Sequence, residues 1–323
     1  TGGGDPAYLA YTEEWSVPAT VSVVQEGQVW YNTTSNVLKG FGAQGTGAWA
    51  SGVPVLTNRP SGVAQGTVTA ALFEGGGNSV LTEEFDGSTW TEVGDLNTGR
   101  TENSGAGTQT AALYFGGNYP PGALNEEWNG ASWSVESTMV TGRYANAGSG
   151  VVTAAITCGG EIPGSGYQGA TELWDGTSWS EKSDLNTVRG MPTNNGTTTA
   201  SICSAGQTPT YAGKTEKWDG STWTEVANQN TGRKNMQQAG FGTQDSCMVY
   251  GGNKPAACDK LTEEYNGSTW TEVGDLVTAR CGAGGAGNTV SSALAIAGYP
   301  APTVTTTVEV WSLPDAIKTF TAT

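Results

Sequence analysis

The chain has 323 residues, of which 49 are glycine and none is histidine, and its formal net charge at pH 7 is −16. Without an imidazole, Ser-His-Asp and Cys-His nucleophile pairs and histidine-ligated zinc or copper sites are excluded. The negative charge argues against nucleic acid as a partner, and no apolar stretch approaches the roughly 18 residues of a membrane span. We therefore expect no cofactor, no metal, no nucleic acid partner and no membrane insertion.

The first 46 residues contain no copy of the repeat described below and are expected to form an N-terminal extension. Residues 12–18 (TEEWSVP) resemble residues 308–314 (VEVWSLP), so a preceding unit of the same kind is expected to end there. The chain also begins without Met and without the basic start and apolar core of a signal peptide. We interpret it as a segment of a longer protein with units in tandem.

Residues 26–41 (EGQVWYNTTSNVLKGF) are predicted to form a β-hairpin with a turn at Thr33 to Asn36. The pattern Gly-Gln-x-Trp-Tyr-Asn-Thr-Thr-Ser within it resembles a short hairpin of bacteriophage tail-fibre and other virion proteins, including those of marine phages. This resemblance implies a virion location.

All six arginines occupy one position of an internal repeat. Each lies ten residues after a tryptophan: Arg59, Arg100, Arg143, Arg189, Arg233 and Arg280 follow Trp49, Trp90, Trp133, Trp179, Trp223 and Trp270. The tryptophans recur every 41 to 47 residues, a period typical of four-stranded propeller blades.

Each copy reads as a meander of short antiparallel strands. In the second copy, the apolar run 111–117 (AALYFGG) suits a strand buried on both faces, and the acidic-aromatic segment 125–128 (NEEW) suits the next strand. Asn129-Gly130 then supplies a tight turn before Trp133. Because single meanders cannot bury both faces, the six copies are predicted to pack radially as an all-β, six-bladed propeller over residues 47–311, followed by a tail at 312–323.

The ends of the repeat region complement one another. The last copy has its apolar run and the strand at Val308 to Trp311, but no turn and no tryptophan strand after them. The first tryptophan stretch, at Trp49, has no blade in front of it. We expect this N-terminal strand to complete the sixth blade and so remove the open edge.

The order of an apolar run with Gly-Gly, an aromatic residue with Asp or Asn, a Trp and an Arg resembles the kelch repeat over about residues 47–311. Kelch propellers include protein-binding modules, sugar-binding proteins and a copper oxidase, so the resemblance implies a fold rather than one function. The arginines and tryptophans, present in every copy, are predicted to be structural, the arginines pairing with carboxylates such as Glu83, Glu126 or Asp175. A ring of anion-binding arginines and a sugar-stacking tryptophan platform are the alternatives.

Binding residues are expected where the copies differ. The connection between the second and third strands varies most, and five such stretches carry Tyr and Pro among small residues. The candidate binding residues in them are Tyr119, Tyr167, Tyr211, Lys254 and Tyr299. The alternative is that these surface loops vary because changes in them are tolerated, without any role in binding.

The five cysteines indicate little. Cys158, Cys203 and Cys247 fall in apolar runs, Cys258 lies in a loop and Cys281 follows Arg280. An odd count leaves at least one thiol unpaired, and a non-oxidising environment is favoured slightly over a disulfide-stapled one.

The sequence therefore favours a non-enzymatic virion protein, a tail fibre or surface appendage in an oligomeric or tandem assembly with other virion subunits. Its variable loops are expected to bind a host-surface glycan or protein. A bacterial cell-surface or secreted kelch adhesion module and a glycan-cleaving, sialidase-like propeller are the alternatives.

Overall fold

The computed structural model describes residues 29–32, 37–43, 47–118, 122–235, 240–255, 257–299 and 303–320. Their regular elements are β-strands, and among them no helix is long and apolar enough to cross a membrane. Two compact units are present: residues 47–312, and residues 1–46 together with 313–323.

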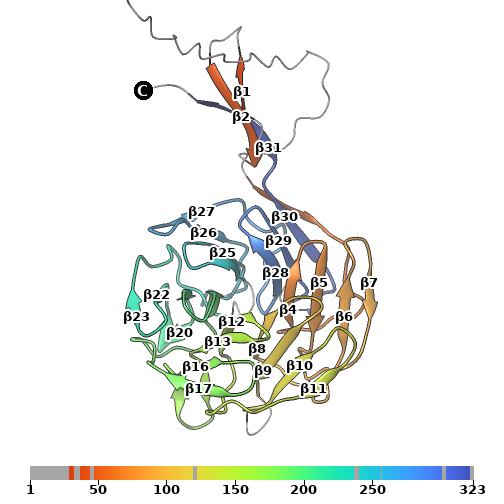
Figure 1. The fold of residues 1–323 in the computed structure, drawn as a ribbon, viewed down its shortest axis with the longest axis vertical. Coiled ribbons are helices and arrows are strands. Elements are labelled where there is room, and N and C mark those ends of the chain that lie inside the picture. Colours follow the sequence, from red (N-terminus) through yellow and green to blue (C-terminus); the bar gives the residue numbers. More distant parts are fainter. Residues whose placement is uncertain are drawn as a thin grey trace, which may run out of the picture. The chain divides into compact units, whose positions relative to one another are not determined.

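Residues 47–312 form six four-stranded antiparallel sheets arranged as blades around a centre (Figure 1). This confirms the prediction of an all-β, six-bladed propeller. Blade 1 consists of β4 (Val63–Thr67), β5 (Ala70–Glu74), β6 (Thr82–Phe85) and β7 (Trp90–Glu92), and blade 2 of β8 (Asn103–Gly107), β9 (Ala112–Gly116), β10 (Asn125–Trp128) and β11 (Trp133–Val135). Blade 3 consists of β12 (Ala147–Val151), β13 (Ala154–Cys158), β16 (Thr171–Trp174) and β17 (Trp179–Lys182), and blade 4 of β18 (Thr193–Gly196), β19 (Ser201–Ser204), β22 (Thr215–Trp218) and β23 (Trp223–Glu225). Blade 5 consists of β24 (Gly240–Thr243), β25 (Ser246–Tyr250), β26 (Thr262–Tyr265) and β27 (Trp270–Glu272), and blade 6 of β28 (Gly284–Thr289), β29 (Ser292–Ile296), β30 (Val308–Ser312) and β3 (Ala48–Ser51).

The sixth blade joins the two ends of the repeat region. Strand β3 pairs antiparallel with β30, with Trp49 opposite Trp311. The Trp49 indole also donates to Thr262 Oγ1 of blade 5 at 3.0 Å. The prediction that an N-terminal strand closes the ring is therefore confirmed.

Aromatic residues fill the spaces between blades. In each blade the aromatic residue of the third strand contacts the tryptophan of the fourth, with ring centroids 4.9 to 5.6 Å apart. The fourth-strand tryptophans also reach the preceding blade: Trp133 donates to Thr82 Oγ1 and Trp223 to Thr171 Oγ1. Because these rings are buried in the protein, they offer no exposed platform for a sugar.

The Asp-Gly and Asn-Gly turns connect the third and fourth strands of blades 1 to 5. In blade 1, Gly87 has a φ of 92°, a left-handed conformation that suits glycine. The Asp86 carboxylate accepts hydrogen bonds from Thr89 and Ser88, and these lower its pKa to about 2. Asp175 makes the equivalent turn contacts to Thr177 and Ser178, so the expectation that it pairs with an arginine is wrong.

The first strand of each blade lies nearest the axis, where these strands contact one another around the ring. Little space separates neighbouring first strands, and the positions with the closest contacts are occupied by glycine. A Cβ atom on Gly148 would lie 2.8 Å from Phe115 Cε2 and 2.9 Å from Ser104 Oγ, both in blade 2.

Gly148→Ala is therefore expected to lower the free energy of unfolding by about 1 to 3 kcal/mol through overpacking. Urea unfolding measures this effect, with Thr69→Ala in an exposed hairpin as the control. Equal stability of both variants would show that the blades can move apart at the axis without loss of folding free energy.

The smaller unit contains the predicted N-terminal hairpin, in which β1 (Val29–Asn32) pairs with β2 (Val37–Ala43). The four residues predicted as its turn lie outside the described residues. A third strand, β31 (Asp315–Phe320), pairs with β2 along its length. The segment predicted as a C-terminal tail therefore contains a strand.

Candidate functional site

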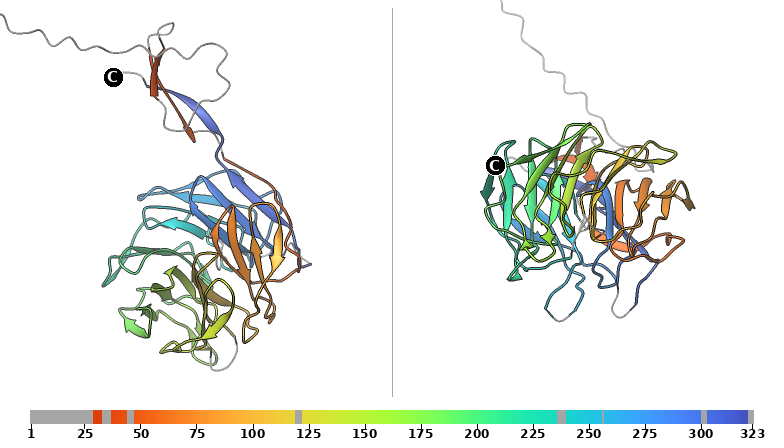
Figure 2. Two further views of the ribbon diagram at one scale, coloured as in Figure 1. Left: turned by 45° about the vertical axis from the view of Figure 1, so that its right-hand side comes forward. Right: turned by 90° about the horizontal axis from the view of Figure 1, so that it is seen from below.

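The propeller has two different faces. On the first, the hairpin face, lie the tight turns that join strands 1 to 2 of each blade and strands 3 to 4 of blades 1 to 5. On the second, the loop face, lie the connections between strands 2 and 3 and the segments that enter each blade. The long connections of blades 5 and 6, cyan and blue in the right-hand view of Figure 2, project from the same side of the ring.

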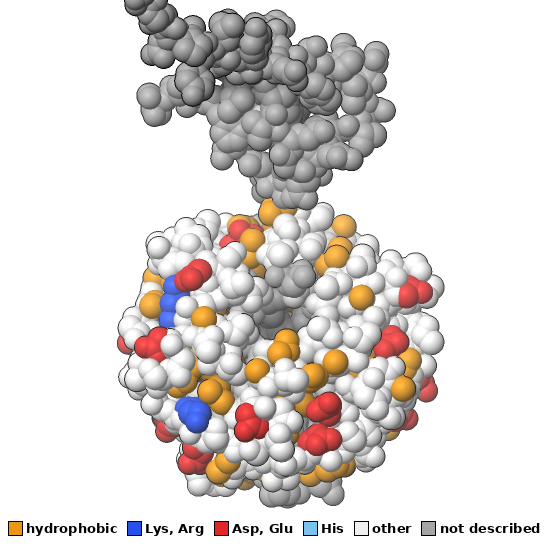
Figure 3. Space-filling model, in the orientation of Figure 1, with side chains coloured by type: hydrophobic (Ala, Val, Ile, Leu, Met, Phe, Trp, Pro, Cys, Tyr) orange, Lys and Arg blue, Asp and Glu red, His pale blue; other side chains and the backbone are white. Residues whose placement is uncertain are grey.

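A central hollow of about 390 Å³ opens on the hairpin face (Figure 3). Each blade contributes one glycine at the end of its first strand: Gly66, Gly107, Gly150, Gly196, Gly242 and Gly287. All six have positive φ values, between 100° and 148°. This ring was not predicted from the sequence, although each of its glycines stands four or five residues before the start of a second strand.

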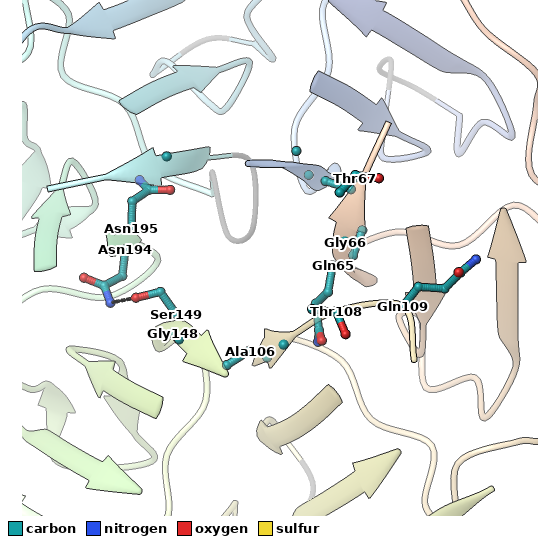
Figure 4. Close-up of a pocket in the computed structure, with 18 of the residues that line it drawn as sticks. Gln65, Gly66, Thr67, Ala106, Thr108, Gln109, Gly148, Ser149, Asn194 and Asn195 are labelled. Carbon is teal, nitrogen blue, oxygen red and sulfur yellow. Dashed lines mark hydrogen bonds between the residues drawn. The ribbon is translucent and has the colours of Figure 1, made fainter. Parts of the chain in front are cut away.

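None of the described residues that line the hollow is charged. Figure 4 shows Gln65, Asn194, Asn195 and Ser149 around it, with Asn194 Nδ2 donating to Ser149 Oγ at 2.9 Å. Similar small residues surround the axis in every blade, so the hollow offers few groups that could distinguish one ligand from another.

Each of the six arginines forms an ion pair with a glutamate on the third strand of the blade it enters. The pairs are Arg59–Glu83, Arg100–Glu126, Arg143–Glu172, Arg189–Glu216, Arg233–Glu263 and Arg280–Glu309. All twelve side chains are buried, with at most 3% of their surface exposed. No arginine is therefore free to bind an anionic ligand.

The arginine segment also links neighbouring blades. The N–H of Gly117 in blade 2 donates to the Arg143 carbonyl at 3.1 Å, while the Arg143 side chain contacts Glu172 of blade 3 at 2.5 Å. Two residues after each arginine the backbone has a positive φ: Ser61, Glu102, Ala145, Met191, Asn235 and Gly282. Four hydrogen bonds of 2.6 to 3.0 Å join these residues between blades, which makes the loop face rigid near the axis.

Blades 3 and 4 carry a group of half-buried polar and aromatic side chains on this rigid frame, here called the loop cluster. It consists of Tyr144, Glu161, Tyr167, Gln207, Tyr211 and Lys234, with Glu102 beside it. Tyr144 exchanges backbone hydrogen bonds with Glu161 at 2.7 and 3.1 Å. Tyr167 lies opposite Glu161 in a short hairpin, and Tyr211 lies opposite Gln207 in the next one.

Electrostatic contacts connect the members of the loop cluster. Lys234 Nζ donates to Gln207 Oε1 at 2.6 Å and lies 5.2 Å from the centre of the Tyr211 ring. Burial, together with a hydrogen bond to Glu161, raises the pKa of Tyr144 to about 12. Burial, the nearby Glu161 carboxylate and Tyr211 raise the pKa of Tyr167, so the two predicted tyrosines lie in one environment.

Gly190 provides the surface on which the Tyr167 ring lies. A Cβ atom at this position would lie 2.7 Å from Tyr167 Cδ1 and 2.9 Å from Cε1. Gly190 is itself fixed by two backbone hydrogen bonds with Gln207, of 2.8 and 2.9 Å. Gly190, Tyr144 and Lys234 carry no signal in the sequence, because only the fold brings the segments after the arginines beside the variable loops. Glu161 begins one of the variable stretches but was not among the candidate binding residues.

The other candidate binding residues lie elsewhere on the loop face or outside the described residues. Lys254 forms an ion pair with Asp259 at 2.7 Å within the connection of blade 5. Tyr299 pairs with Cys281 through backbone hydrogen bonds of 2.8 and 3.1 Å in blade 6. Tyr119 lies outside the described residues.

Cys258 and Cys281 form a disulfide bond that joins the blade 5 connection to the segment entering blade 6. The sequence does not reveal this pairing, because the two cysteines are 23 residues apart and become neighbours only through the blade packing. Disulfides persist in oxidising environments, whereas the odd cysteine count slightly favoured a non-oxidising one. The remaining three cysteines are free and buried.

No group of three His, Cys, Asp or Glu side chains within the described ranges is placed to hold a metal ion. No family model and no curated protein matches the chain. Among solved structures, the structure of YjhT superposes with a TM-score of 0.65 at 14% identity, covering 79% of this chain and 96% of that one. At this identity the similarity supports the propeller fold alone.

Proposed function

We propose that this chain is a non-enzymatic virion protein, part of a tail fibre or surface appendage, whose kelch-like propeller binds a host-surface glycan or protein at its loop face. The loop cluster carries the proposal. Tyr167 and Tyr211 come from different blades, lie close enough to interact electrostatically, and are held by a backbone frame that is already fixed by hydrogen bonds. Rigid aromatic side chains bind partners at low entropic cost.

The virion location rests on the hairpin at residues 26–41 and its likeness to tail-fibre hairpins. Mass spectrometry of purified phage particles against host envelope fractions tests it: the chain is expected in the particles. Detection in the envelope alone would instead favour the second candidate, a cell-surface or secreted adhesion module. The Cys258–Cys281 disulfide favours that candidate as an extracellular protein.

A sialidase-like activity has less support. Such enzymes need arginines to hold the carboxylate of an acidic sugar, and all six arginines here are buried in pairs with glutamates. Glycosidase assays on acidic and neutral surface glycans are expected to show no turnover.

Replacing both Tyr167 and Tyr211 by Ala is expected to reduce attachment to host cells by about tenfold or more, since each ring supplies contact area and stacking. The melting temperature is expected to stay nearly unchanged, because both rings are only half-buried. Val135→Ala, on an exposed edge strand, is the control. Unaltered attachment in the double variant would place the binding surface elsewhere.

A further inference from the structure

The charges around the loop cluster limit what can bind there. Two carboxylates, Glu102 and Glu161, lie close enough to influence each other, and burial followed by the Glu161 charge raises the pKa of Glu102. The charge of Lys234 opposes this rise in the pKa of Glu102. Lys234 already donates to Gln207 and lies over Tyr211.

Most other cations of the propeller are engaged in ion pairs elsewhere, and Lys182 is exposed on β17. All six arginines pair with buried glutamates, and Lys214, Lys217, Lys254 and Lys260 pair with carboxylates. The whole chain carries a formal charge of −16. A ligand bearing carboxylate or sulfate groups would therefore meet two like charges at the cluster and a repulsive field around it.

The remaining groups suit hydroxyl-rich, uncharged ligands. The carboxylates of Glu102 and Glu161 accept hydrogen bonds, while the Lys234 ammonium donates them. Tyr167 lies over Gly190 and Tyr211 lies beneath Lys234, so each has a fixed ring position. Fixed aromatic rings pack against the apolar faces of sugar rings, and nearby charged acceptors bind the hydroxyls at their edges.

We propose that the loop cluster binds a neutral saccharide and discriminates against acidic ones such as sialylated, uronic or sulfated glycans. This rests on the proposed binding function and specifies its ligand class. Tyr167 and Tyr211 supply the stacking surface, and Glu102, Glu161 and Lys234 supply the hydroxyl contacts and the selection against negative charge.

The test measures binding of the full chain to an array of neutral, sialylated, uronic and sulfated oligosaccharides, followed by titration calorimetry on the best binders. Neutral saccharides are expected to bind, with affinity reduced about tenfold in Tyr211→Ala and unchanged in Val135→Ala. Gly190→Ala is expected to weaken binding similarly, because its methyl group would displace the Tyr167 ring without removing it.

A separate variant tests the discrimination against acidic saccharides. Combining Glu102→Gln with Glu161→Gln is expected to narrow the preference for neutral over acidic saccharides, since both repelling charges are removed while each side chain keeps one acceptor oxygen. Circular dichroism and melting temperature establish that each variant is folded. If Tyr211→Ala proves unfolded, Gly190→Ala and the Gln variant still test the site.

Three results would overturn this inference. Preferential binding of acidic glycans, abolished by Tyr211→Ala, would refute the ligand class while leaving the binding function intact. Binding of neutral saccharides that no cluster variant affects would refute the site. Binding of a purified host protein in place of any saccharide, lost in Tyr211→Ala, would refute the saccharide and support a protein-binding propeller.

Discussion

Removal of residues 1–59 is expected to open the ring and cause aggregation, whereas removal of residues 1–46 is expected to leave a folded propeller. The shorter truncation ends before β3, which supplies the outer strand of blade 6. The longer one removes β3 and Arg59, the partner of Glu83 in blade 1. It leaves the edge of β30 unpaired, and exposed strand edges promote association with other chains.

Size-exclusion chromatography with light scattering and thermal unfolding distinguish these outcomes. Both truncations remove β2, the partner of β31, so they differ in β3 and the segment up to Arg59. The truncation at residue 46 is expected to keep a folded propeller that melts cooperatively, while the truncation at residue 59 is expected in large aggregates. As a control, a synthetic peptide of residues 47–59 is added to the longer truncation during refolding. It is expected to reduce the aggregation, because it restores β3 and Arg59. Equal stability of the two truncations would show that β3 is dispensable for closure.

The repeat explains why so much of the fold could be predicted from the sequence. Six copies of one pattern reinforce each other, so the second, third and fourth strands could be placed from glycines, acidic-aromatic segments and tryptophans. The first strands were harder, because segments such as 103–107 (NSGAG) lack both apolar alternation and strong β-propensity. Packing against neighbouring blades at the axis, which favours glycine, determines their conformation.

The candidate site was predictable only in part. Variation among copies pointed to the connections that contain Tyr167 and Tyr211, and both tyrosines do lie in one cluster on the loop face. Tyr144 and Lys234 each follow an arginine of the repeat and showed no local signal. Their relation to the variable loops depends on backbone pairs such as Tyr144 with Glu161, which form only when the blades are assembled.

The six buried ion pairs connect the segment between two blades to the third strand of the next blade. Loss of one pair is expected to lower the free energy of unfolding. Arg143 Nη1 contacts Glu172 Oε1 at 2.5 Å and the Thr141 carbonyl at 3.1 Å. The same carboxylate accepts the backbone N–H of Val140 at 2.7 Å and of Thr141 at 3.2 Å. Glu172 of blade 3 therefore fixes both the backbone at Val140 and Thr141 and the side chain of Arg143.

Arg143→Ala is expected to lower the free energy of unfolding by about 3 to 5 kcal/mol, because it leaves the Glu172 carboxylate buried without its countercharge. Lys214→Ala, which breaks the half-exposed pair with Glu225, is the control and is expected to cost no more than about 1 kcal/mol. Urea unfolding of both variants measures the difference.

Pairing Arg143→Ala with Glu172→Gln separates the charge from the packing. The Val140 and Thr141 N–H groups bind different oxygens of Glu172, and the single amide oxygen of Gln can keep one of these two hydrogen bonds. The double variant is still expected to be more stable than Arg143→Ala alone, because no buried charge is left without a partner. That recovery would show that an uncompensated buried charge, and not the cavity left by the arginine, dominates the loss. If Arg143→Ala were no more harmful than Lys214→Ala, the arginine repeat would have to be retained for something other than stability, and the interpretation of these residues as structural would be wrong.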